Sequence, residues 1–135
     1  MNTITIEAKV TNVPQVTDVI DEYLESLDCP LREQMQIDVA IDEIITNVSM
    51  YSYGDSVGTV TIEYDKLSDR NGIQLIFTDT GIPFDPTQHE DPDTSLSAEE
   101  RRIGGLGIFM VKKSMDVLNY EYRDNCNVFT VKKYF

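Results

Sequence analysis

The chain has 135 residues, of which 41% are hydrophobic, and this is enough for one domain with an apolar core. Eleven basic against 24 acidic residues give a formal charge of −13, which disfavours nucleic acid or an anionic membrane as a partner. No apolar run approaches membrane-spanning length, residues 1–6 show no signal-peptide pattern, and Cys29 and Cys126 fit no metal or redox spacing, so we expect a reduced, cytoplasmic protein.

The first half of the chain predicts one strand and two helices. Residues 3–10 alternate between apolar and polar side chains, which is typical of a half-buried strand. Asn12 then has the place of a helix N-cap, with Gln15 three residues later, and apolar residues recur at helical spacing up to residue 27. A second helix is predicted from about residue 31 to residue 51 for the same reason.

The second half predicts a hairpin, a long connection, a helix and two closing strands. Residues 58–64 and 73–79 alternate on either side of a turn. Residues 80–103 show no sustained periodicity, and so long a connection is either disordered or a functional lid. A third helix is predicted to open at residues 104–107, with strands near 117–123 and 127–134.

This order of elements predicts the fold class α/β (α+β). We expect a two-layer α/β sandwich with a mixed, mainly antiparallel sheet and three helices on one face. The whole of residues 1–135 would form a single domain, with a lid over about residues 82–103.

Glu43 and Asn47 lie four residues apart on the second predicted helix, so they share one face of it. They fall beside the apolar stripe, at the border of the core, where a cleft is expected. A carboxylate can accept a proton, and an amide oxygen can bind a hard cation such as Mg²⁺. The pair is therefore a candidate site, although a hydrogen bond at the border of a helix has the same spacing.

Asp79 and Gly81 stand where a predicted strand ends and the irregular connection begins. A buried carboxylate at this place can accept a hydrogen bond from an exocyclic amine such as adenine N6. Glycine lets a flat ring approach the backbone. A simple turn favours the same two residues, so this motif alone leaves both interpretations open.

A run of glycines opens the third predicted helix. Exposed backbone N–H groups at a helix N-terminus bind anions, which favours phosphate binding here over a merely flexible start of the helix. The run matches neither a Walker loop nor a dinucleotide fingerprint. The candidate phosphate-binding residues are Gly104, Gly105, Leu106, Gly107 and Ile108.

Two further polar groups are candidates for ligand contacts. Arg101 and Arg102 precede the glycine run, where an arginine could reach a terminal phosphate. Thr130, in the last predicted strand, is either an ordinary strand residue or a hydroxyl that reaches a bound base.

The order of the three motifs resembles that of the GHKL ATPases, which share the Bergerat ATP-binding fold. These motifs are Glu-x-x-x-Asn on the second helix, Asp-x-Gly after a strand, and the glycine run after a lid. Within this superfamily the short chain is similar to the anti-sigma-factor serine kinases over nearly its whole length. The similarity is carried by residues 44–47, 83–86 and 105–109.

The resemblance implies ATP and Mg²⁺ as cofactors. Asn47 would hold the metal ion, and Glu43 would take the proton from an attacking serine hydroxyl or orient that hydroxyl. Asp79 would bind adenine with the help of Gly81 and Thr130.

At the other end of the nucleotide, the resemblance implies that residues 104–108 enclose the phosphates. Arg102 or Arg101 would contact the γ-phosphate. Phosphoryl transfer of this kind depends on positioning and electrostatic stabilisation.

The implied activity is that of a protein serine kinase acting on a small, STAS-like anti-sigma-factor antagonist. A sigma factor and a second copy of the chain are the other implied partners. Two alternatives stay open: a non-catalytic, ATP-dependent module that binds a partner, and an ATPase in which Glu43 activates water. The chain departs from its relatives at Tyr51, where many kinases have histidine, and at Pro83, which replaces a glycine.

Overall fold

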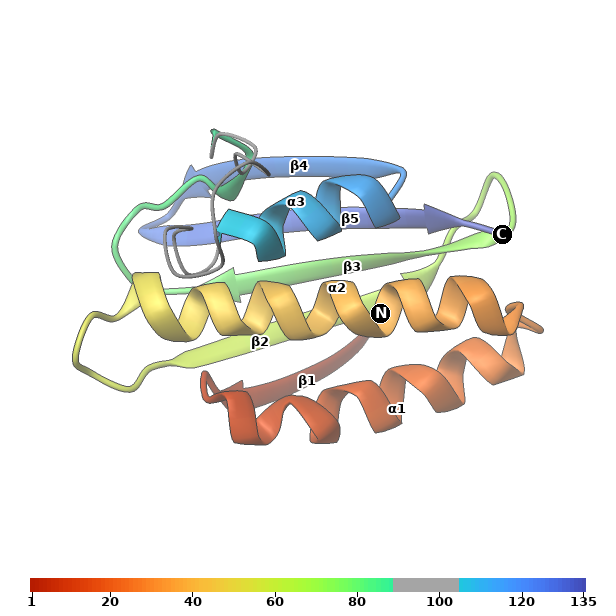
Figure 1. The fold of residues 1–135 in the computed structure, drawn as a ribbon, viewed down its shortest axis with the longest axis horizontal. Helices are drawn as coiled ribbons and strands as arrows, with labels where there is room; N and C mark the ends of the chain where they lie inside the picture. The colour runs from red at the N-terminus through yellow and green to blue at the C-terminus, as the bar shows by residue number, and fades with distance from the viewer. Residues whose placement is uncertain (89–104) are drawn as a thin grey trace.

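Residues 1–88 and 105–135, which the computed structural model describes, form five strands and three α-helices (Figure 1). The strands are β1 (Asn2–Glu7), β2 (Thr59–Lys66), β3 (Gly72–Asp79), β4 (Val117–Arg123) and β5 (Cys126–Tyr134). The helices are α1 (Val13–Ser26), α2 (Leu31–Asn47) and α3 (Gly105–Ser114). The strands form one sheet in the order β1-β2-β3-β5-β4, and each of these neighbouring pairs is antiparallel.

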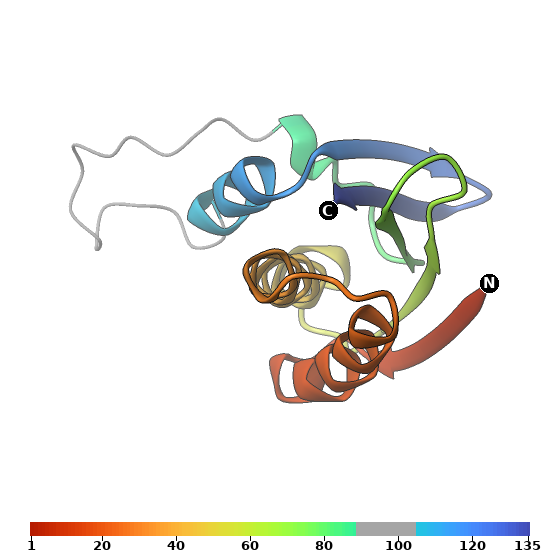
Figure 2. The same ribbon diagram turned by 90° about the vertical axis from the view of Figure 1, so that its right-hand side faces the viewer.

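The helices all lie on one face of the sheet, as Figure 2 shows from the side. In Figure 1, α1 runs beside β1, α2 crosses the middle of the sheet, and α3 lies over β4 and β5. The predicted two-layer sandwich is confirmed. No helix within residues 1–88 or 105–135 has the length and apolar character needed to cross a bilayer.

The core is built on rows of side chains that run across the sheet. Ile4, Ile62, Phe77, Phe129 and Tyr120 are successive cross-strand partners, one from each strand. Because side chains alternate between the two faces of a strand, all five point to the same face, toward the helices. The helix α2 contributes fully buried isoleucines to the same cluster, and burying such a side chain contributes roughly 1.5–3 kcal/mol.

The neighbouring row of helix-facing side chains is apolar on β1 and β2 but polar on β3 and β5. Ile6 pairs with Val60, Val60 pairs with Asp79, and Asp79 pairs with Asn127. Asp79 and Asn127 are only 5% and 4% exposed. Buried polar groups are costly unless they are hydrogen-bonded, so this end of the sheet must be organised around the pair.

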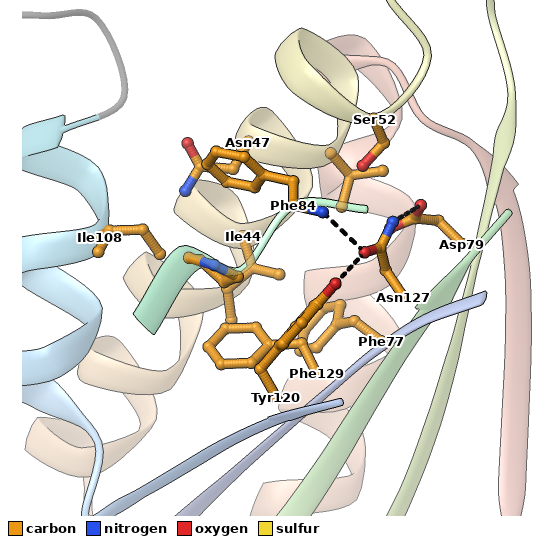
Figure 3. A pocket seen from close by; sticks show the side chains of 12 residues that line it. Ile44, Asn47, Ser52, Phe77, Asp79, Phe84, Ile108, Tyr120, Asn127 and Phe129 are labelled. Atoms are coloured by element: carbon orange, nitrogen blue, oxygen red, sulfur yellow. Dashed lines mark hydrogen bonds between the residues drawn. The ribbon is translucent and has the colours of Figure 1, made fainter. Parts of the chain in front are cut away.

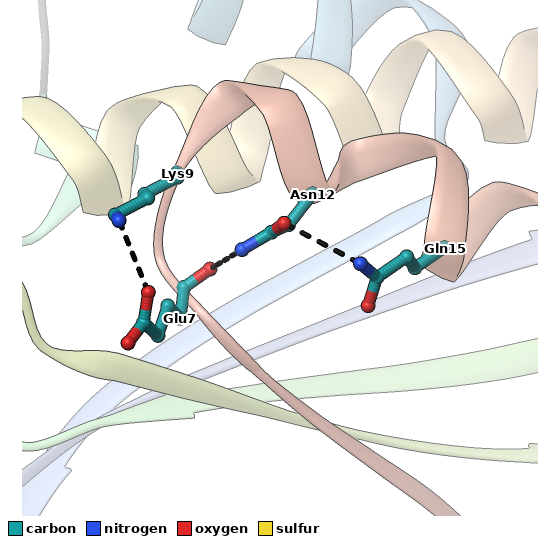
Figure 4. A network of polar contacts seen from close by, with 4 residues as sticks. All are labelled: Glu7, Lys9, Asn12 and Gln15. Atoms are coloured by element: carbon teal, nitrogen blue, oxygen red, sulfur yellow. Dashed lines mark hydrogen bonds and ion pairs between the residues drawn. The ribbon is translucent and has the colours of Figure 1, made fainter.

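The start of α1 differs from the predicted capping box. Residues Val10–Asn12 form a 3₁₀ turn that runs into the helix, so Asn12 has helical backbone angles and its side chain makes no capping bond. Its amide instead donates to the carbonyl of Glu7 at 3.1 Å and accepts from the side chain of Gln15 at 3.4 Å (Figure 4). The side chain of Asn12 thus ties the end of β1 to α1.

A pair of acidic side chains faces across the seam between α1 and α2. In both Asp21 and Asp38, Oδ1 is buried and has no hydrogen-bond partner among the described residues. Burial, together with the neighbouring Asp21 carboxyl group, raises the pKa of Asp38 to about 8. Two carboxyl groups this close favour a state in which one of them keeps a proton.

Asp38→Asn should reduce the pH dependence of stability. The folded-state pKa lies above the unfolded value, so the folded protein holds a proton that the unfolded chain has lost between about pH 4 and about pH 8. Stability therefore falls as the pH rises through this window. We expect a flatter dependence for the variant and a larger free energy of unfolding than wild type at the alkaline end.

Urea denaturation at both ends of the window measures this difference. Glu25→Gln, at an exposed position of α1, is the matched control and should follow the wild-type dependence. Equal slopes for wild type and Asp38→Asn would contradict the assignment.

Candidate functional site

A pocket opens beside the C-terminal end of α2 (Figure 3). It lies between the C-terminal end of β3, the start of β5 and the start of α3. It has a volume of about 370 Å³, counting its open mouth. Aromatic and aliphatic side chains form most of its wall. The polar residues in the wall are Asn47, Ser52, Asp79 and Asn127. An apolar cavity with a few converging polar groups is typical of a small-molecule site.

Asn127 is the centre of a hydrogen-bond network at the sheet end of the pocket. Its Nδ2 donates to Asp79 Oδ1 at 2.9 Å and to the carbonyl of Ile82 at 2.8 Å. Its Oδ1 accepts from the backbone N–H of Phe84 at 3.0 Å and from the hydroxyl of Tyr120. Burial raises the pKa of Tyr120, which keeps its hydroxyl protonated and able to donate.

Among the described residues, one oxygen of the Asp79 carboxylate accepts hydrogen bonds and the other accepts none. Oδ1 accepts from Asn127 and from the backbone N–H of Gly81, each at 2.9 Å. Within the described part of the chain, no donor is bonded to Oδ2. Asp79 lines the pocket and is 5% exposed, so the second oxygen is an acceptor available to a bound molecule.

Gly81 is needed where the chain leaves β3 and packs against the end of α2. There α2 continues into a π-helical turn, Val48–Ser52, and the carbonyl of Ser52 accepts a hydrogen bond from Ile82 N–H at 2.7 Å. A Cβ atom on Gly81 would overlap the backbone of Ser52. The structure therefore explains this glycine by close backbone packing at the wall of the pocket.

Asn47 lies at the opposite side of the pocket from Asp79, toward α3 (Figure 3). It is the last residue of α2 and is 5% exposed. Its Nδ2 is buried and has no hydrogen-bond partner among the described residues. A buried amide without a partner costs free energy, and such a group in a pocket wall is typical of a ligand contact.

Glu43 stands one helical turn before Asn47 and is half-buried between α2 and α3. Its carboxylate lies so close to Gly107 that a Cβ atom on that residue would overlap it. Burial, and to a lesser extent the charge of Asp42, raises the pKa of Glu43. A raised pKa makes the carboxylate a stronger base at neutral pH.

The glycine run is only partly within the described residues. Helix α3 begins at Gly105, so Gly105, Leu106 and Gly107 form its first turn. Ile108 is 1% exposed and lines the pocket. Gly104, Arg101, Arg102 and most of the predicted lid lie in residues 89–104, outside the described residues.

The structure does not bring Thr130 to this pocket. In the register of β3 and β5, Thr130 pairs with Ile76, whereas Asp79 pairs with Asn127. Phe129 and Val131 point to the core, so Thr130 between them points to the opposite face of the sheet. The cross-strand position beside Asp79 belongs to Asn127.

Sequence reasoning missed Asn127, Tyr120 and Phe84. One signal was present: the inward positions of the last strand include Phe129 and Val131, and Asn127 continues them with a polar residue. A polar side chain at an inward position of a strand indicates a buried contact. That this contact is Asp79 follows only from the strand register.

Residues 6–133 of the chain match the family described as the histidine kinase-like ATPase domain, and the chain belongs to this family. Among curated proteins it is similar to the serine-protein kinase RsbW of Listeria monocytogenes, with 30% identity over 99 residues, or 70% of this chain and 62% of the relative. RsbW of Bacillus cereus is 26% identical over 98 residues, covering 70% of this chain and 60% of that protein.

A further relative is the serine/threonine-protein kinase BtrW of Bordetella bronchiseptica, which is 25% identical over 100 residues, or 74% of this chain and 70% of the relative. These similarities confirm the resemblance to the anti-sigma-factor serine kinases within the superfamily. The chain spans about 62% of the length of the Listeria relatives it matches.

Asn47→Leu should make the unliganded protein more stable. The substitution replaces a buried amide that lacks a partner with an apolar side chain of similar volume, so we expect a gain of about 1 kcal/mol in the free energy of unfolding. Thermal unfolding without ligand measures it. Asn119→Leu, at an exposed position of β4, is the control. A loss of stability in Asn47→Leu would contradict the view that this amide is unpaired.

Proposed function

We propose that this chain binds ATP with Mg²⁺ in the pocket and transfers the γ-phosphate to a serine hydroxyl of a protein partner. The observation that carries the proposal is the arrangement of polar groups in and beside one pocket. A carboxylate with a free oxygen stands at the sheet end, and an amide without a partner stands at the end of α2. A second carboxylate lies one turn before that amide, against the start of α3.

The sheet end suits the base of the nucleotide. Asp79 Oδ2 can accept a hydrogen bond from the exocyclic amine of adenine, and the aromatic side chains of Phe77, Phe84 and Phe129 line the same pocket. Flat apolar walls with one fixed acceptor favour a planar base.

The α2 end suits the phosphates. Asn47 would hold Mg²⁺ through its amide oxygen, which is a ligand that this ion accepts. Its unpaired Nδ2 is a donor and would be left to contact an acceptor such as a phosphate oxygen. A bound Mg²⁺ would neutralise charge on the phosphates, which matters in a chain with a formal charge of −13. Backbone N–H groups in the first turn of α3 would add donors, and residues 104–108 with Arg102 are the proposed phosphate contacts.

Glu43 is the proposed catalytic base. In the reaction, the serine oxygen forms a bond to the γ-phosphorus, the bond from that phosphorus to the bridging oxygen breaks, and ADP leaves. The serine proton goes to the Glu43 carboxylate, whose pKa is raised by burial. Thr130 has no part in this proposal, since its side chain faces the other side of the sheet.

The names of the relatives support a serine acceptor, because two of them are called serine-protein kinases. The proposed acceptor is a small, STAS-like anti-sigma-factor antagonist, and the proposed second partner is a sigma factor. The chain would act as a single domain in the cytoplasm, with residues 82–103 as a lid and a homodimer as its assembled form.

Glu43→Gln tests the catalytic assignment. The variant keeps the size and shape of the side chain but cannot take up the serine proton. We expect ATP affinity within about twofold of wild type and a loss of about 100-fold or more in phosphoryl transfer. Transfer of radioactive γ-phosphate to candidate antagonist proteins measures the rate, and calorimetry measures the affinity.

Glu22→Gln, at an exposed position of α1, is the matched control and should retain transfer. Transfer at the wild-type rate in Glu43→Gln would remove Glu43 as the base. Phosphate release without a protein acceptor would favour a water-activating ATPase, and tight ATP binding without any transfer would favour a non-catalytic module.

Gly107→Ala tests the contact between α2 and α3. Its methyl group would displace the Glu43 carboxylate, so we expect transfer to fall about tenfold or more while Glu43 is still present. The same transfer assay measures this effect. Met110→Ala, at an exposed position of the same helix, should leave the rate unchanged. An unchanged rate in Gly107→Ala would show that the position of Glu43 is not critical.

A further inference from the structure

We infer that Asn127 is a specificity-determining residue that makes the pocket select a 6-aminopurine. It does so through Asp79, by fixing the plane of the carboxylate and so the position of the oxygen that faces the bound base. The inference rests on the proposed nucleotide binding and adds to it a positioning residue on β5.

The orientation of the Asn127 amide is fixed by four hydrogen bonds. Nδ2 donates twice, to Asp79 Oδ1 and to the carbonyl of Ile82, and Oδ1 accepts twice, from Phe84 N–H and the Tyr120 hydroxyl. Turning the amide over would place its oxygen against two acceptors and its NH₂ group against a backbone donor. Three of the four contacts would be lost in a residue that is 4% exposed, because only the Tyr120 hydroxyl can accept as well as donate, so one orientation is strongly preferred.

The fixed amide in turn fixes the Asp79 carboxylate. Oδ1 is held by Asn127 Nδ2 and by Gly81 N–H. Rotating the carboxylate out of its present plane would break both bonds. Oδ2 is therefore the oxygen left for a ligand, at a defined position in the wall of the pocket.

A carboxylate oxygen such as Asp79 Oδ2 accepts hydrogen bonds and cannot donate them. The 6-amino group of adenine offers a donor to it, whereas the 6-oxo group of guanine or hypoxanthine would bring a second acceptor against it. A purine without a substituent at position 6 forms neither contact. Selectivity for the 6-amino group thus depends on how firmly Asp79 is held.

Removing the Asn127 side chain would loosen several segments at once. Asp79 would keep only the Gly81 contact, and the carbonyl of Ile82 and the N–H of Phe84 would each lose the bond to Asn127. These residues lie between the end of β3 and Pro86, in the part of the chain that forms one wall of the pocket. Asn127 therefore joins the base-binding carboxylate to the irregular segment that follows β3 and, through Tyr120, to β4.

The test compares two ligands on the full chain: ATP, and purine riboside triphosphate, which lacks the 6-amino group. Because hydrogen bonds to charged groups are strong, wild type should prefer ATP by about 10–100-fold. We expect Asn127→Ala to lower this ratio by about fivefold or more, mainly through weaker ATP binding. A residue that merely maintains the fold would weaken both ligands equally, and an unchanged ratio would overturn the inference.

Asn119→Ala, on the same hairpin but exposed, is the matched control and should keep the wild-type ratio. Tyr120→Phe is the second variant, for the case in which Asn127→Ala does not fold. It removes one donor to Asn127 Oδ1 and keeps the aromatic ring. The ATP preference should fall by about twofold or more, and wild-type preference in this variant would count against the inference.

A measurement without nucleotide separates this inference from the proposed function. In the ligand-free protein, amide hydrogen exchange at Gly81 should be faster in Asn127→Ala than in wild type or Asn119→Ala, because the Asp79 carboxylate that accepts from this N–H is held less firmly. Unchanged exchange at Gly81 would overturn the positioning role. If wild type bound neither triphosphate, the proposed function would fail and the selectivity with it. If wild type discriminated and Asn127→Ala discriminated equally, only this inference would fail.

Discussion

The hydrogen bond between Asn127 and Asp79 is the constraint on which the pocket depends. Both residues occupy inward positions of neighbouring strands, where the rest of the sheet places apolar side chains against the helices. A buried carboxylate and amide are tolerated there because each bonds to the other, and because Gly81, Phe84 and Tyr120 donate further bonds that leave only Asp79 Oδ2 for a ligand. The wall of the pocket follows from this requirement. The chain after β3 must pass close enough for its backbone groups to reach Asn127, which holds residues 82–84 beside the cavity.

The other side of the site depends on the packing of α2 against α3. Glu43 and Asn47 are one turn apart on α2, and the absence of a side chain at Gly107 lets the Glu43 carboxylate approach α3. The π-helical turn after Asn47 brings the carbonyl of Ser52 to Ile82, so the end of α2 and the end of β3 are joined directly. Membership of the histidine kinase-like ATPase family agrees with this arrangement of a helix, a strand end and a glycine-rich helix start around one cavity.

Most of the fold could be predicted from the sequence, because each element has a clear periodicity. The strands and helices lie within a few residues of their predicted bounds, and the two-layer arrangement follows from their order. The position of Asn47 at the border of the core could also be predicted, since it follows from helical spacing alone. Thr130 could not be assigned in this way. A hydroxyl in the last strand was a reasonable partner for a base, but the pairing of β3 with β5 decides which residue lies beside Asp79. Shifting a strand by one residue exchanges its two faces, and local pattern does not fix the pairing of strands distant in sequence.

The sequence by itself determined the elements, the acidic character of the chain, and the motifs at Glu43, Asn47, Asp79 and the glycine run, because these properties reside in neighbouring residues. The tertiary structure alone decided that Asn127, 48 positions away along the chain, holds the Asp79 carboxylate. It also decided that Gly81 packs on Ser52, that Gly107 receives the Glu43 side chain, and that Asp38 meets Asp21 across two helices. Each of these contacts joins segments that are distant in the sequence. The sequence does not show that such segments lie close together in space. The contacts exist because burial of one continuous core fixes the register of the sheet and the packing of the helices, and the polar groups carried into that core must then find partners there.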